Sequence, residues 1–565
     1  MNIVKSPKFP LIMFFVSGLS AILLTVFLFD NDILKDVFRT RTYYFIWITV
    51  CSLLYLINKK FPFSLMISSE NVKKNFMPFV YGFGLTVIIF SVVEPDFRVL
   101  ADETNLLNVS QAFYQLREFS HPIESDYYYD MRHFINPAIP HRPGLWPFFA
   151  SILHTILGYS SHNAFILNFI ISWAILTTIV FIGEILIHRF LGYIAALLLA
   201  VYPIFTLNAT SGGFDPINLL FLLWVGISLT SFIKKPDGVT FEILLVLFAL
   251  NAQCRYESVI LLFPISIAFI WKYRPSVLKH SNVLFSLLPF LFLPILWQRI
   301  LSPELVNEGD KGKVALLFSI IPEHAANAWE FFFQKGNPEF PNSPLIGILA
   351  IIGIILAVIH FFKYYAEKET FWAVGLVALG NILIAIIHFA YYLGDYRFAF
   401  IMRYSVAHLG IISLFAAYPI YVAYEYKQWK IQSILFLIFI AFISLPVAAK
   451  NERGKSLFLH RDFKICRKYI ESLGTNNVLV ITDRPSMYTA LGVGSLNFEY
   501  SNSNAQLIIH NLKRHLYRNV FVIQHIRYTD NSAVESLNPE YELEPVLEFQ
   551  NSEVDYVRLA KVIAK

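Results

Sequence analysis

Two adjacent carboxylates, Asp102 and Glu103, stand nine residues after an apolar run that ends near residue 93. Paired carboxylates beside a membrane can act as a general base or bind a divalent cation. A structural role competes with both, because acidic residues are favoured in the first turn of a helix by the helix dipole. The segment that follows is aromatic and rich in proline, as expected of a substrate cavity. We therefore take Asp102 and Glu103 as candidate catalytic residues.

Several basic residues stand at the ends of apolar runs. His141 and Arg142 precede a return to apolar sequence, Arg255 interrupts an apolar stretch, and Arg403 opens another. Ionisable groups at membrane depth are costly and are therefore functional candidates, and arginine presents a planar fork to phosphate oxygens. The alternatives are an ion pair between Arg255 and Glu257, and side chains that extend to the membrane interface. With the carboxylates, these basic residues predict a site for a phosphate-bearing lipid.

Tyr256 and Tyr404 directly follow two of these arginines, and we expect both rings to line the substrate cavity. Asp215 is a further candidate for this cavity, in the sequence Gly-Gly-Phe-Asp-Pro. An N-cap before Pro216 is the alternative explanation of Asp215. No metal site is predicted from histidines, since those of the same region lack a tight ligand spacing.

Composition shows which elements must position these residues. Of 565 residues, 56% are apolar and 15% are charged, with a mean hydropathy of +0.55. Soluble chains carry about 25% charged residues, so a fully soluble, disordered or collagen-like protein is excluded. The net charge of +5 comes from dispersed basic residues, which excludes a nucleic-acid-binding stripe. The three cysteines predict no disulfide framework.

Apolar runs of spanning or nearly spanning length predict about 13 transmembrane helices, the first of them uncleaved. These runs are at 10–29, 43–57, 76–93, 163–183, 190–206, 214–233, 241–252, 256–271, 282–299, 345–362, 370–392, 402–424 and 431–447. The stretch 241–271 is either a bent pair or one helix broken near Asn251 to Glu257.

Basic residues predict the orientation, because cytoplasmic loops retain lysine and arginine. Loops on the N-terminal side of the membrane hold most of them, so the N-terminus is expected in the cytoplasm. Leu145 to Leu157 is apolar but only 13 residues long, too short for a perpendicular crossing, and we place it along the interface. An odd number of crossings then predicts an extracytoplasmic C-terminus on an inner or plasma membrane.

Two outer loops, 94–162 and 300–344, are long and acidic. The first has eight Asp and Glu against four Arg, and the second has six against three Lys. Loops of this length are usually functional or disordered, and the aromatic residues of the first favour order. Leu106, Val109, Phe113 and Leu116 recur at helical spacing, which predicts an amphipathic helix on the outer membrane surface.

Residues 451–565 differ in composition, with 27 charged residues in 115 positions. Short buried-strand runs at 478–482 and 520–524, a helical pattern at 503–516, and a closing hairpin at 541–549 and 554–559 predict a small α/β domain. Three parts follow: two additional N-terminal helices in 1–75, a membrane body in 76–450, and a soluble extracytoplasmic domain in 451–565. The fold class is thus a polytopic α-helical membrane protein with a small C-terminal α/β domain.

The order of these motifs resembles the GT-C superfamily of membrane glycosyltransferases. The likeness is to the branch of protein mannosyltransferases and lipid A aminoarabinose transferase. It spans roughly 76–424 and rests on VLADETNLLNVSQAFYQL, HRPGLWPFFASILHTILGYSSHNAFILNFI, SGGFDPINLLFLLWV and MRYSVAHLG. The single proline after Arg142 and the two extra N-terminal helices depart from the family pattern.

The resemblance implies a polyprenyl-phosphate-linked sugar donor, a reaction at the outer face, and a lipid, glycan or protein acceptor. By match, Asp102 acts on the acceptor with Glu103 in support, while Arg142 contacts the lipid phosphate. Inversion at the anomeric carbon would follow, with Arg255 and Arg403 stabilising the leaving phosphate. No cofactor is obligatory, although a divalent cation at Asp102 and Glu103 stays an alternative.

Two other classes of function fit parts of the sequence. A transporter of a lipid-linked or anionic substrate would suit many helices with buried arginines, although paired halves with broken helices are not evident. An oligosaccharide ligase or polymerase would use lipid-diphosphate donors. Product analysis separates single-sugar transfer from block transfer, and substrate flux without sugar transfer would favour the transporter.

Overall fold

The protein is described by a computed structural model over residues 9–28, 30–62, 69–128, 131–135, 137–274, 277–280, 283–301, 316–333, 342–364, 368–398, 400–450 and 458–563. The chain divides into two compact units. The helical unit comprises 1–96, 141–146 and 165–452, and the sheet unit comprises 97–140, 147–164 and 453–565. Each unit is described by itself below.

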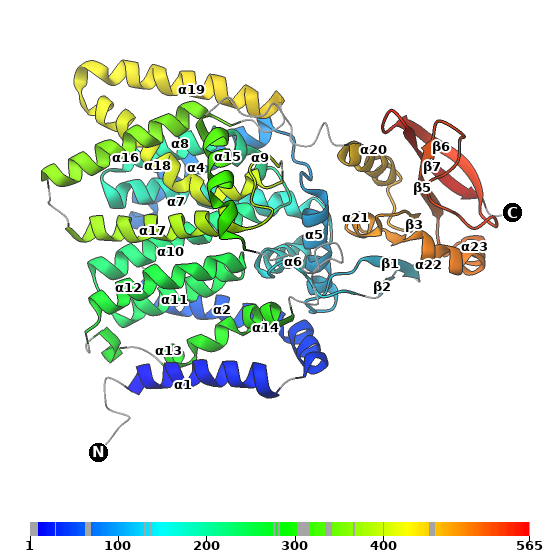
Figure 1. Cartoon of the computed structure of the whole chain (residues 1–565), viewed down its shortest axis with the longest axis horizontal. Coiled ribbons are helices and arrows are strands. Elements are labelled where there is room, and N and C mark those ends of the chain that lie inside the picture. The colour runs from blue at the N-terminus through cyan, green and yellow to red at the C-terminus, as the bar shows by residue number, and fades with distance from the viewer. Residues whose placement is uncertain are drawn as a thin grey trace. The chain divides into compact units, whose positions relative to one another are not determined.

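The helical unit is built from apolar helices, many of them long (Figure 1). Its helices are α1 (Phe9–Leu23), α2 (Asn31–Lys60), α4 (Ser69–Val92), α7 (Asn163–Leu186), α8 (Arg189–Ala200), α9 (Pro203–Ala209), α10 (Asp215–Lys234), α11 (Gly238–Ala252), η3 (Tyr256–Leu261), α12 (Leu262–Lys272), α13 (Val283–Leu287), η5 (Leu288–Phe292), α14 (Leu293–Leu301), α15 (Ile321–Phe333), α16 (Pro344–Tyr364), α17 (Lys368–Ala390), η9 (Met402–Ser405), α18 (Val406–Glu425) and α19 (Lys430–Lys450).

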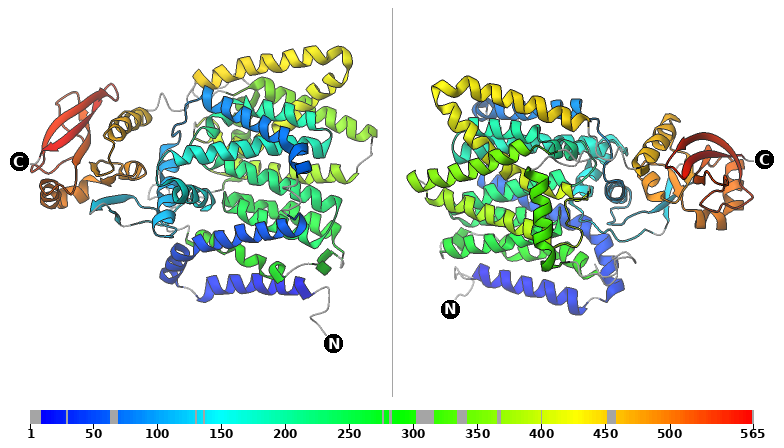
Figure 2. Two further views of the ribbon diagram at one scale, coloured as in Figure 1. Left: turned by 180° about the vertical axis from the view of Figure 1, so that it is seen from behind. Right: turned by 45° about the horizontal axis from the view of Figure 1, so that its top comes forward.

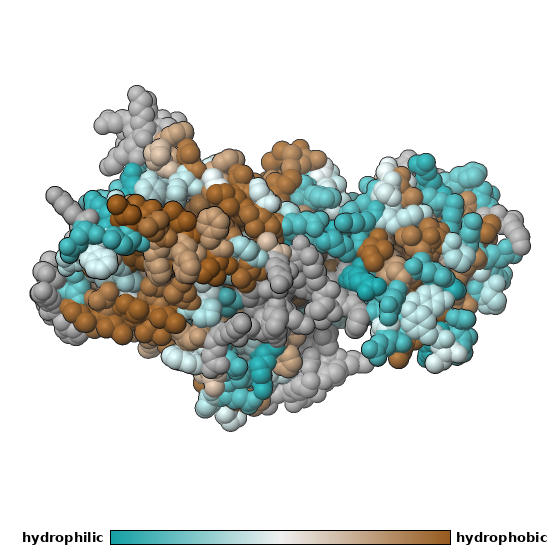
Figure 3. All heavy atoms as spheres, turned by 90° about the horizontal axis from the view of Figure 1, so that it is seen from above, coloured by the Kyte–Doolittle hydropathy of each residue, from teal (hydrophilic) through white to brown (hydrophobic). Residues whose placement is uncertain are grey.

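Within the described residues, nine helices are long and apolar enough to cross a membrane, or ten if one bent pair counts as a span. Gly238–Ala252 and Pro344–His360 are shorter apolar helices that coincide with two further predicted runs. A multi-pass helical membrane protein is therefore confirmed, while the count of 13 crossings stays a prediction. Figure 3 shows the matching surface, which is mainly apolar over the helical unit and more polar over the sheet unit.

The run predicted to span at 190–206 is not one straight helix. Helix α8 ends at Ala200, and α9 begins at Pro203 after a bend of 76°. Proline lacks the backbone N–H that a continuing helix needs and keeps the preceding residue out of the helical conformation, which for Tyr202 is extended. Both short helices remain buried, so the bend brings the polar segment after α9 inside the unit.

Helix α10 lies at the centre of the helical unit, packed against α11, α17 and α18. The two views of Figure 2 show α10 and α11 side by side among the other helices. Close contact between α16 and α18 requires Gly353, because a Cβ at this position would collide with the carbonyl group of Phe415. The start of α10 and the start of α18 hold candidate site residues, so this packing positions them.

The sheet unit contains a seven-stranded sheet in the order β2-β1-β4-β3-β5-β7-β6. Its strands are β1 (Glu124–Tyr128), β2 (Met131–Ile135), β3 (Val478–Ile481), β4 (Gly494–Leu496), β5 (Asn519–Arg527), β6 (Glu542–Gln550) and β7 (Asp555–Ile563). Its helices are α5 (Leu100–Gln115), α6 (Leu145–Leu157), α20 (Phe458–Ser472), α21 (Pro485–Thr489), α22 (Phe498–Ser503) and α23 (Ala505–Lys513). Strands β4, β3 and β5 are parallel, and the others pair antiparallel.

The strands predicted in the C-terminal region are confirmed, including the antiparallel closing hairpin of β6 and β7. One feature was not predicted: β1, from the first outer loop, pairs with β4 through Ser125 and Ser495. The sheet is thus completed by a segment more than 300 residues earlier in the chain. The division of the chain at residue 451 stays a prediction, and the C-terminal segment shares its sheet with the first outer loop.

The helix predicted after Asp102 and Glu103 is present as α5, but its predicted surface position is wrong. Nearly every residue from Glu103 to Phe113 is buried, including Asn108 and Gln111. Helix α21 packs against α5, and Asn108 donates a hydrogen bond of 2.7 Å to the carbonyl oxygen of Ser486. The burial of α5 within the protein, with Asn108 bonded to α21, explains why this helix needs no apolar stripe facing a membrane.

His154 links α5, α6 and the start of α7 inside the sheet unit. Its Nε2 lies 3.0 Å from Ser110 Oγ, and Asn163 Nδ2 lies 2.9 Å from its Nδ1. The same amide nitrogen donates to the carbonyl oxygen of Gly158 at 2.8 Å, so Nδ1 accepts and Nε2 carries the proton. Burial lowers the pKa of His154 to about 4, because a second proton would be desolvated and would displace the Asn163 bond.

We expect acid to destabilise the protein through His154. The folded pKa lies below the ordinary value, so stability is full above about pH 6.5 and falls as the pH drops towards 4, by up to about 3 kcal/mol. The apparent Tm of wild type should therefore drop more between pH 7.5 and pH 4.5 than that of His154→Gln. His510→Gln removes an exposed histidine of the same unit and is the control. Equal acid sensitivity of all three proteins would contradict the assignment.

Candidate active site

An ion pair joins the beginning of α10 to the break between α11 and η3. Asp215 is the first residue of α10, and its Oδ1 lies 2.6 Å from Arg255 Nη2. The N-cap explanation of Asp215 is wrong, because Phe214 occupies that position and no side-chain cap bond is present. Only 4% of Asp215 and 5% of Arg255 are exposed. Such a pair is stable away from water only while both charges remain matched.

Glu257 supplies a second carboxylate to the same arginine. Its Oε1 lies 2.5 Å from Arg255 Nη1, as the ion-pair alternative predicted. The break in 241–271 is also confirmed, because α11 ends at Ala252 and Arg255 is extended before η3 begins. His388, at the end of α17, lies 3.6 Å from Glu257 through Nε2. Three elements therefore converge on one buried arginine.

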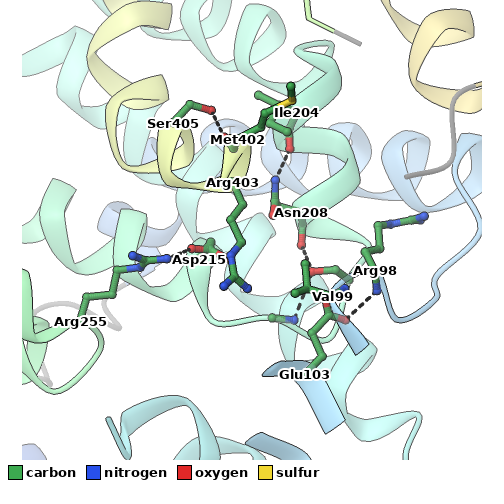
Figure 4. A network of polar contacts seen from close by, with 12 residues as sticks. Arg98, Val99, Glu103, Ile204, Asn208, Asp215, Arg255, Met402, Arg403 and Ser405 are labelled. Carbon is green, nitrogen blue, oxygen red and sulfur yellow. Dashed lines mark hydrogen bonds and ion pairs between the residues drawn. The ribbon is translucent and has the colours of Figure 1, made fainter. Parts of the chain in front are cut away.

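Arg403 approaches the carboxylate of Asp215 from η9, the segment before α18. Its Nε lies 3.9 Å from Asp215 Oδ2, and 3% of the residue is exposed. Figure 4 shows Asp215 between the side chains of Arg255 and Arg403. The guanidinium of Arg255 lies 4.8 Å from the ring centre of Phe214 and 4.4 Å from that of Tyr404, within the range of cation–π attraction.

Arg142 and Tyr256 lie at the more accessible side of this group. Tyr256 is 39% exposed, and the charges of Arg142 and Arg255 both act on its hydroxyl group. Arg142 also acts on the hydroxyl group of Tyr391, just beyond α17. His141 is exposed. The helical unit thus brings together Asp215, Arg255, Arg403, Tyr404, Tyr256 and Arg142.

Asp102 and Glu103 belong to the sheet unit, in the first turn of α5. The carboxylate of Glu103 turns back and accepts the backbone N–H groups of Arg98 and Val99, at 3.1 and 2.9 Å (Figure 4). These bonds satisfy donors that a helix start leaves unpaired, so Glu103 has the structural role weighed above. Asp102 is only partly buried and is the more accessible of the two carboxylates.

Glu257 and His388 were not among the predicted site residues. Glu257 was weighed only as a partner of Arg255, and its place in an apolar stretch was the signal that it faces a protein interior. His388 lies about 130 residues from Glu257, at the end of an apolar run, so spacing carries no sign of their contact. His388 also stacks near Tyr404 and His408, at ring-centre distances of 4.8 and 5.8 Å.

An ion pair forms within the turn between α17 and η9, where Asp395 meets Arg397. Arg397 donates to Asp395 Oδ1 from its backbone N–H at 2.9 Å and to Oδ2 from Nε at 2.8 Å. Burial would raise the pKa of Asp395, but these hydrogen bonds hold it below its ordinary value. Arg397 is 61% exposed and binds no part of the Arg255 group in the described residues.

An apolar cavity of about 430 Å³ lies between α7, α10, α16, α17 and α18. Leu186, Gly226, Thr230, Phe371 and Tyr418 are among its lining residues. The lining residues on α10, from Leu223 to Thr230, follow Asp215 by 8 to 15 residues, which places the cavity about 12–22 Å along that helix from the ion-pair group. The same helices therefore carry charged residues at one end and an apolar cavity towards the other.

Comparison with known families gives a match over part of the chain. Residues 141–297 match the family model of dolichyl-phosphate-mannose-protein mannosyltransferases. The matched segment contains Asp215, Arg255 and Glu257, which two ion pairs join, and it also contains Arg142. The resemblance predicted from the sequence is thereby confirmed. No curated protein sequence matches the chain.

Two solved structures are similar to this chain. The oligosaccharyltransferase of Archaeoglobus fulgidus in the apo form has 12% identity, covers 80% of this chain and 69% of its own, and gives a TM-score of 0.45. ArnT from Cupriavidus metallidurans bound to undecaprenyl phosphate has 10% identity, covers 86% and 98%, and gives a TM-score of 0.46.

Proposed function

We propose that this protein is a membrane glycosyltransferase that moves a single sugar from a polyprenyl-phosphate-linked donor to an acceptor hydroxyl. The reaction takes place at the outer face of the membrane, with inversion at the anomeric carbon. One observation carries the proposal: the segment that matches the mannosyltransferase family supplies Asp215 and Arg255, and these lie with Arg403 in one buried charged group. The same segment supplies Arg142, whose charge acts on Tyr256 beside this group.

Arg403 and Arg142 are the residues we assign to the donor phosphate. Arg255 already has two carboxylates at 2.6 and 2.5 Å, so its charge is balanced within the protein. Its role is to position Asp215 and Tyr404 rather than to bind the phosphate directly. Arg403 lies farther from Asp215 than Arg255 does, at 3.9 Å against 2.6 Å, so the attraction between Arg403 and this carboxylate is weaker.

The apolar cavity supports a lipid-linked donor rather than a soluble sugar nucleotide. A polyprenyl chain is a long hydrocarbon, and burial of each CH₂ group in such a space is favourable by about 0.8 kcal/mol. The cavity lies about 12–22 Å from Asp215 along α10, so an extended chain whose phosphate meets Arg403 can reach it.

The proposed step needs one base and one leaving group. Asp102 takes the proton of the acceptor hydroxyl while its oxygen forms a bond to the anomeric carbon. The bond between that carbon and the phosphate oxygen breaks at the same time, and the electron pair leaves on the polyprenyl phosphate. Arg403 and Arg142 stabilise the charge that develops on this oxygen, an interaction that strengthens in the transition state. Glu103 holds the helix start that presents Asp102.

Product analysis tests this function. We expect mass spectrometry of envelope glycolipids and glycoproteins to show one species that loses the mass of a single sugar when wild type is replaced by Asp102→Asn. The missing mass identifies sugar and acceptor together. Loss of a multi-sugar block would instead indicate a ligase or polymerase. An unchanged glycan profile, with substrate flux in proteoliposomes, would indicate a transporter.

A further inference from the structure

The connections between the parallel strands of the sheet unit change direction at β3. From β3 the chain continues to β4 on one side, then crosses to β5 on the other side of β3. Open α/β sheets bind ligands at the carboxyl ends of strands beside such a change of direction. In this sheet the position lies beyond the ends of β3 and β5.

Three side chains with metal-ligand chemistry meet at this position. Asp483 follows β3 by two residues, and His525 lies in the part of β5 that extends past the end of β3. Glu535 lies in the segment after β5, which returns to the side of that strand. The backbone N–H of His525 donates to Glu535 Oε2 at 2.9 Å. One ligand atom from each of the three lies within 4.8 Å of the others. That spacing allows one ion to contact all three.

A fourth carboxylate is buried beside them without a hydrogen-bond partner on one oxygen. Asp462 lies in the second turn of α20, which runs back along the sheet before β3, and only 8% of it is exposed. Its Oδ1 has no hydrogen-bond partner among the described residues. The charges of His525 and Arg484 act on this carboxylate. A buried carboxylate oxygen that lacks a donor is costly, and a bound cation nearby would offset that cost.

The imidazole of His525 contacts a further carboxylate, that of Asp555, through Nδ1. Its Nδ1 lies 3.4 Å from Asp555 Oδ2 and 3.3 Å from Asn551 Nδ2. Metal-binding histidines commonly have such a carboxylate on the ring nitrogen that does not bind the metal, which fixes the orientation of the ring.

Arg484 offers a purely structural explanation, but only for part of this group. Its Nε lies 3.4 Å from Asp483 Oδ2 at the partly exposed rim. That pair satisfies Asp483 and leaves the unbonded oxygen of Asp462 unexplained. Repulsion among three carboxylates around His525 also favours a doubly charged ion over one arginine.

We propose that Asp483, His525 and Glu535 form a binding site for one divalent metal ion of the Zn²⁺ or Mn²⁺ class, with Asp462 as a nearby buried carboxylate. One imidazole with two carboxylates suits these ions, whereas sites for Ca²⁺ and Mg²⁺ are built from oxygen alone. The ion would join β3, β5 and the segment after β5. It would stabilise the sheet unit and takes no part in the proposed sugar transfer.

Metal titration of the full-length protein tests this site. The protein, purified with a tag that lacks histidine, is stripped with a chelator and titrated by calorimetry with Zn²⁺ and separately with Mn²⁺. We expect one ion per chain for at least one of them, and a Kd at least about tenfold weaker for Asp483→Asn and His525→Gln. Asp483 is exposed, so this variant should fold normally.

Glu544→Gln is the matched control, because it removes an exposed carboxylate on β6, two strands away from β5. It should bind the ion like wild type. Bound metal should also raise the apparent Tm of wild type and Glu544→Gln but not of the two site variants. Absence of binding by wild type, or equal binding by all four proteins, would overturn the proposal. Neither result bears on sugar transfer, which is measured separately.

Discussion

Replacement of Asp102 by asparagine should lower sugar transfer by about 10²–10⁴-fold, the range expected for loss of a general base. Asparagine keeps the size and polarity of the side chain but cannot accept the acceptor proton. The fold should survive, because Asp102 is only partly buried and the start of α5 is stabilised by the hydrogen bonds of Glu103.

The neighbouring carboxylate gives a contrasting result. Glu103→Gln keeps one side-chain oxygen for the N–H groups of Arg98 and Val99 but loses the negative charge at the start of α5. We expect it to cost about 1 kcal/mol of stability and to affect transfer less than Asp102→Asn does. The two variants separate the chemical role from the structural role of adjacent acidic residues.

Transfer is measured with purified protein in liposomes, from a labelled polyprenyl-phosphate sugar to an acceptor found by the mass-spectrometric comparison. Donor binding is measured in the same preparation and should be unchanged in Asp102→Asn. Glu330→Gln, which alters an exposed carboxylate of α15, is the control and should transfer at the wild-type rate. Wild-type transfer by Asp102→Asn would remove this residue from the catalytic role.

The sequence predicted best those elements whose signal is local. The strands at 478–482 and 520–524 are short apolar runs, and they form β3 and β5 in the buried middle of the sheet. The break between α11 and η3 was predictable from polar residues inside an apolar stretch. Such features depend on neighbouring residues alone, so composition and periodicity are sufficient to find them.

Local sequence patterns could not predict which distant segments pair with each other. Residues 124–128 carry no apolar alternation, yet they form β1 because β4 offers an open edge more than 300 residues later. The same limit explains the surface position wrongly predicted for α5: this helix is covered by segments such as α21, whose Ser486 bonds to Asn108 from far away in the chain. The bend before Pro203 did have a local signal, which is the proline itself. The continuous apolar run nevertheless predicted a single helix.

The candidate site shows the same difference between local signals, which the sequence carries, and long-range packing, which it does not. Arg255, Asp215 and Arg403 were identified one by one as ionisable groups in apolar surroundings, a local property. Their arrangement around Asp215, with Glu257 and His388, depends on how α10, α17 and α18 pack. Sequence alone therefore assigned Arg142, Arg255 and Arg403 to the donor phosphate. In the structure, the distances to carboxylates distinguish Arg255, which is neutralised at 2.6 and 2.5 Å, from Arg403, which lies 3.9 Å from Asp215.

This distinction leads to an expected loss of stability in one variant. Arg255→Ala should lower the free energy of unfolding by about 3–5 kcal/mol, because it leaves Asp215 and Glu257 as buried charges without their closest partner. The double variant Arg255→Gln with Glu257→Gln should recover part of this loss, since it removes one stranded charge together with the arginine. Thermal unfolding of the detergent-solubilised protein measures both effects.

Arg403→Gln should behave differently, with weaker donor binding by about tenfold or more and a smaller loss of stability, because Asp215 keeps Arg255 at 2.6 Å. Arg397→Ala removes an arginine that is 61% exposed and should change neither property. If Arg255→Ala kept wild-type stability but lost donor binding, Arg255 would be a phosphate ligand. The carboxylates of Asp215 and Glu257 would then hold it in place for the donor rather than neutralise it.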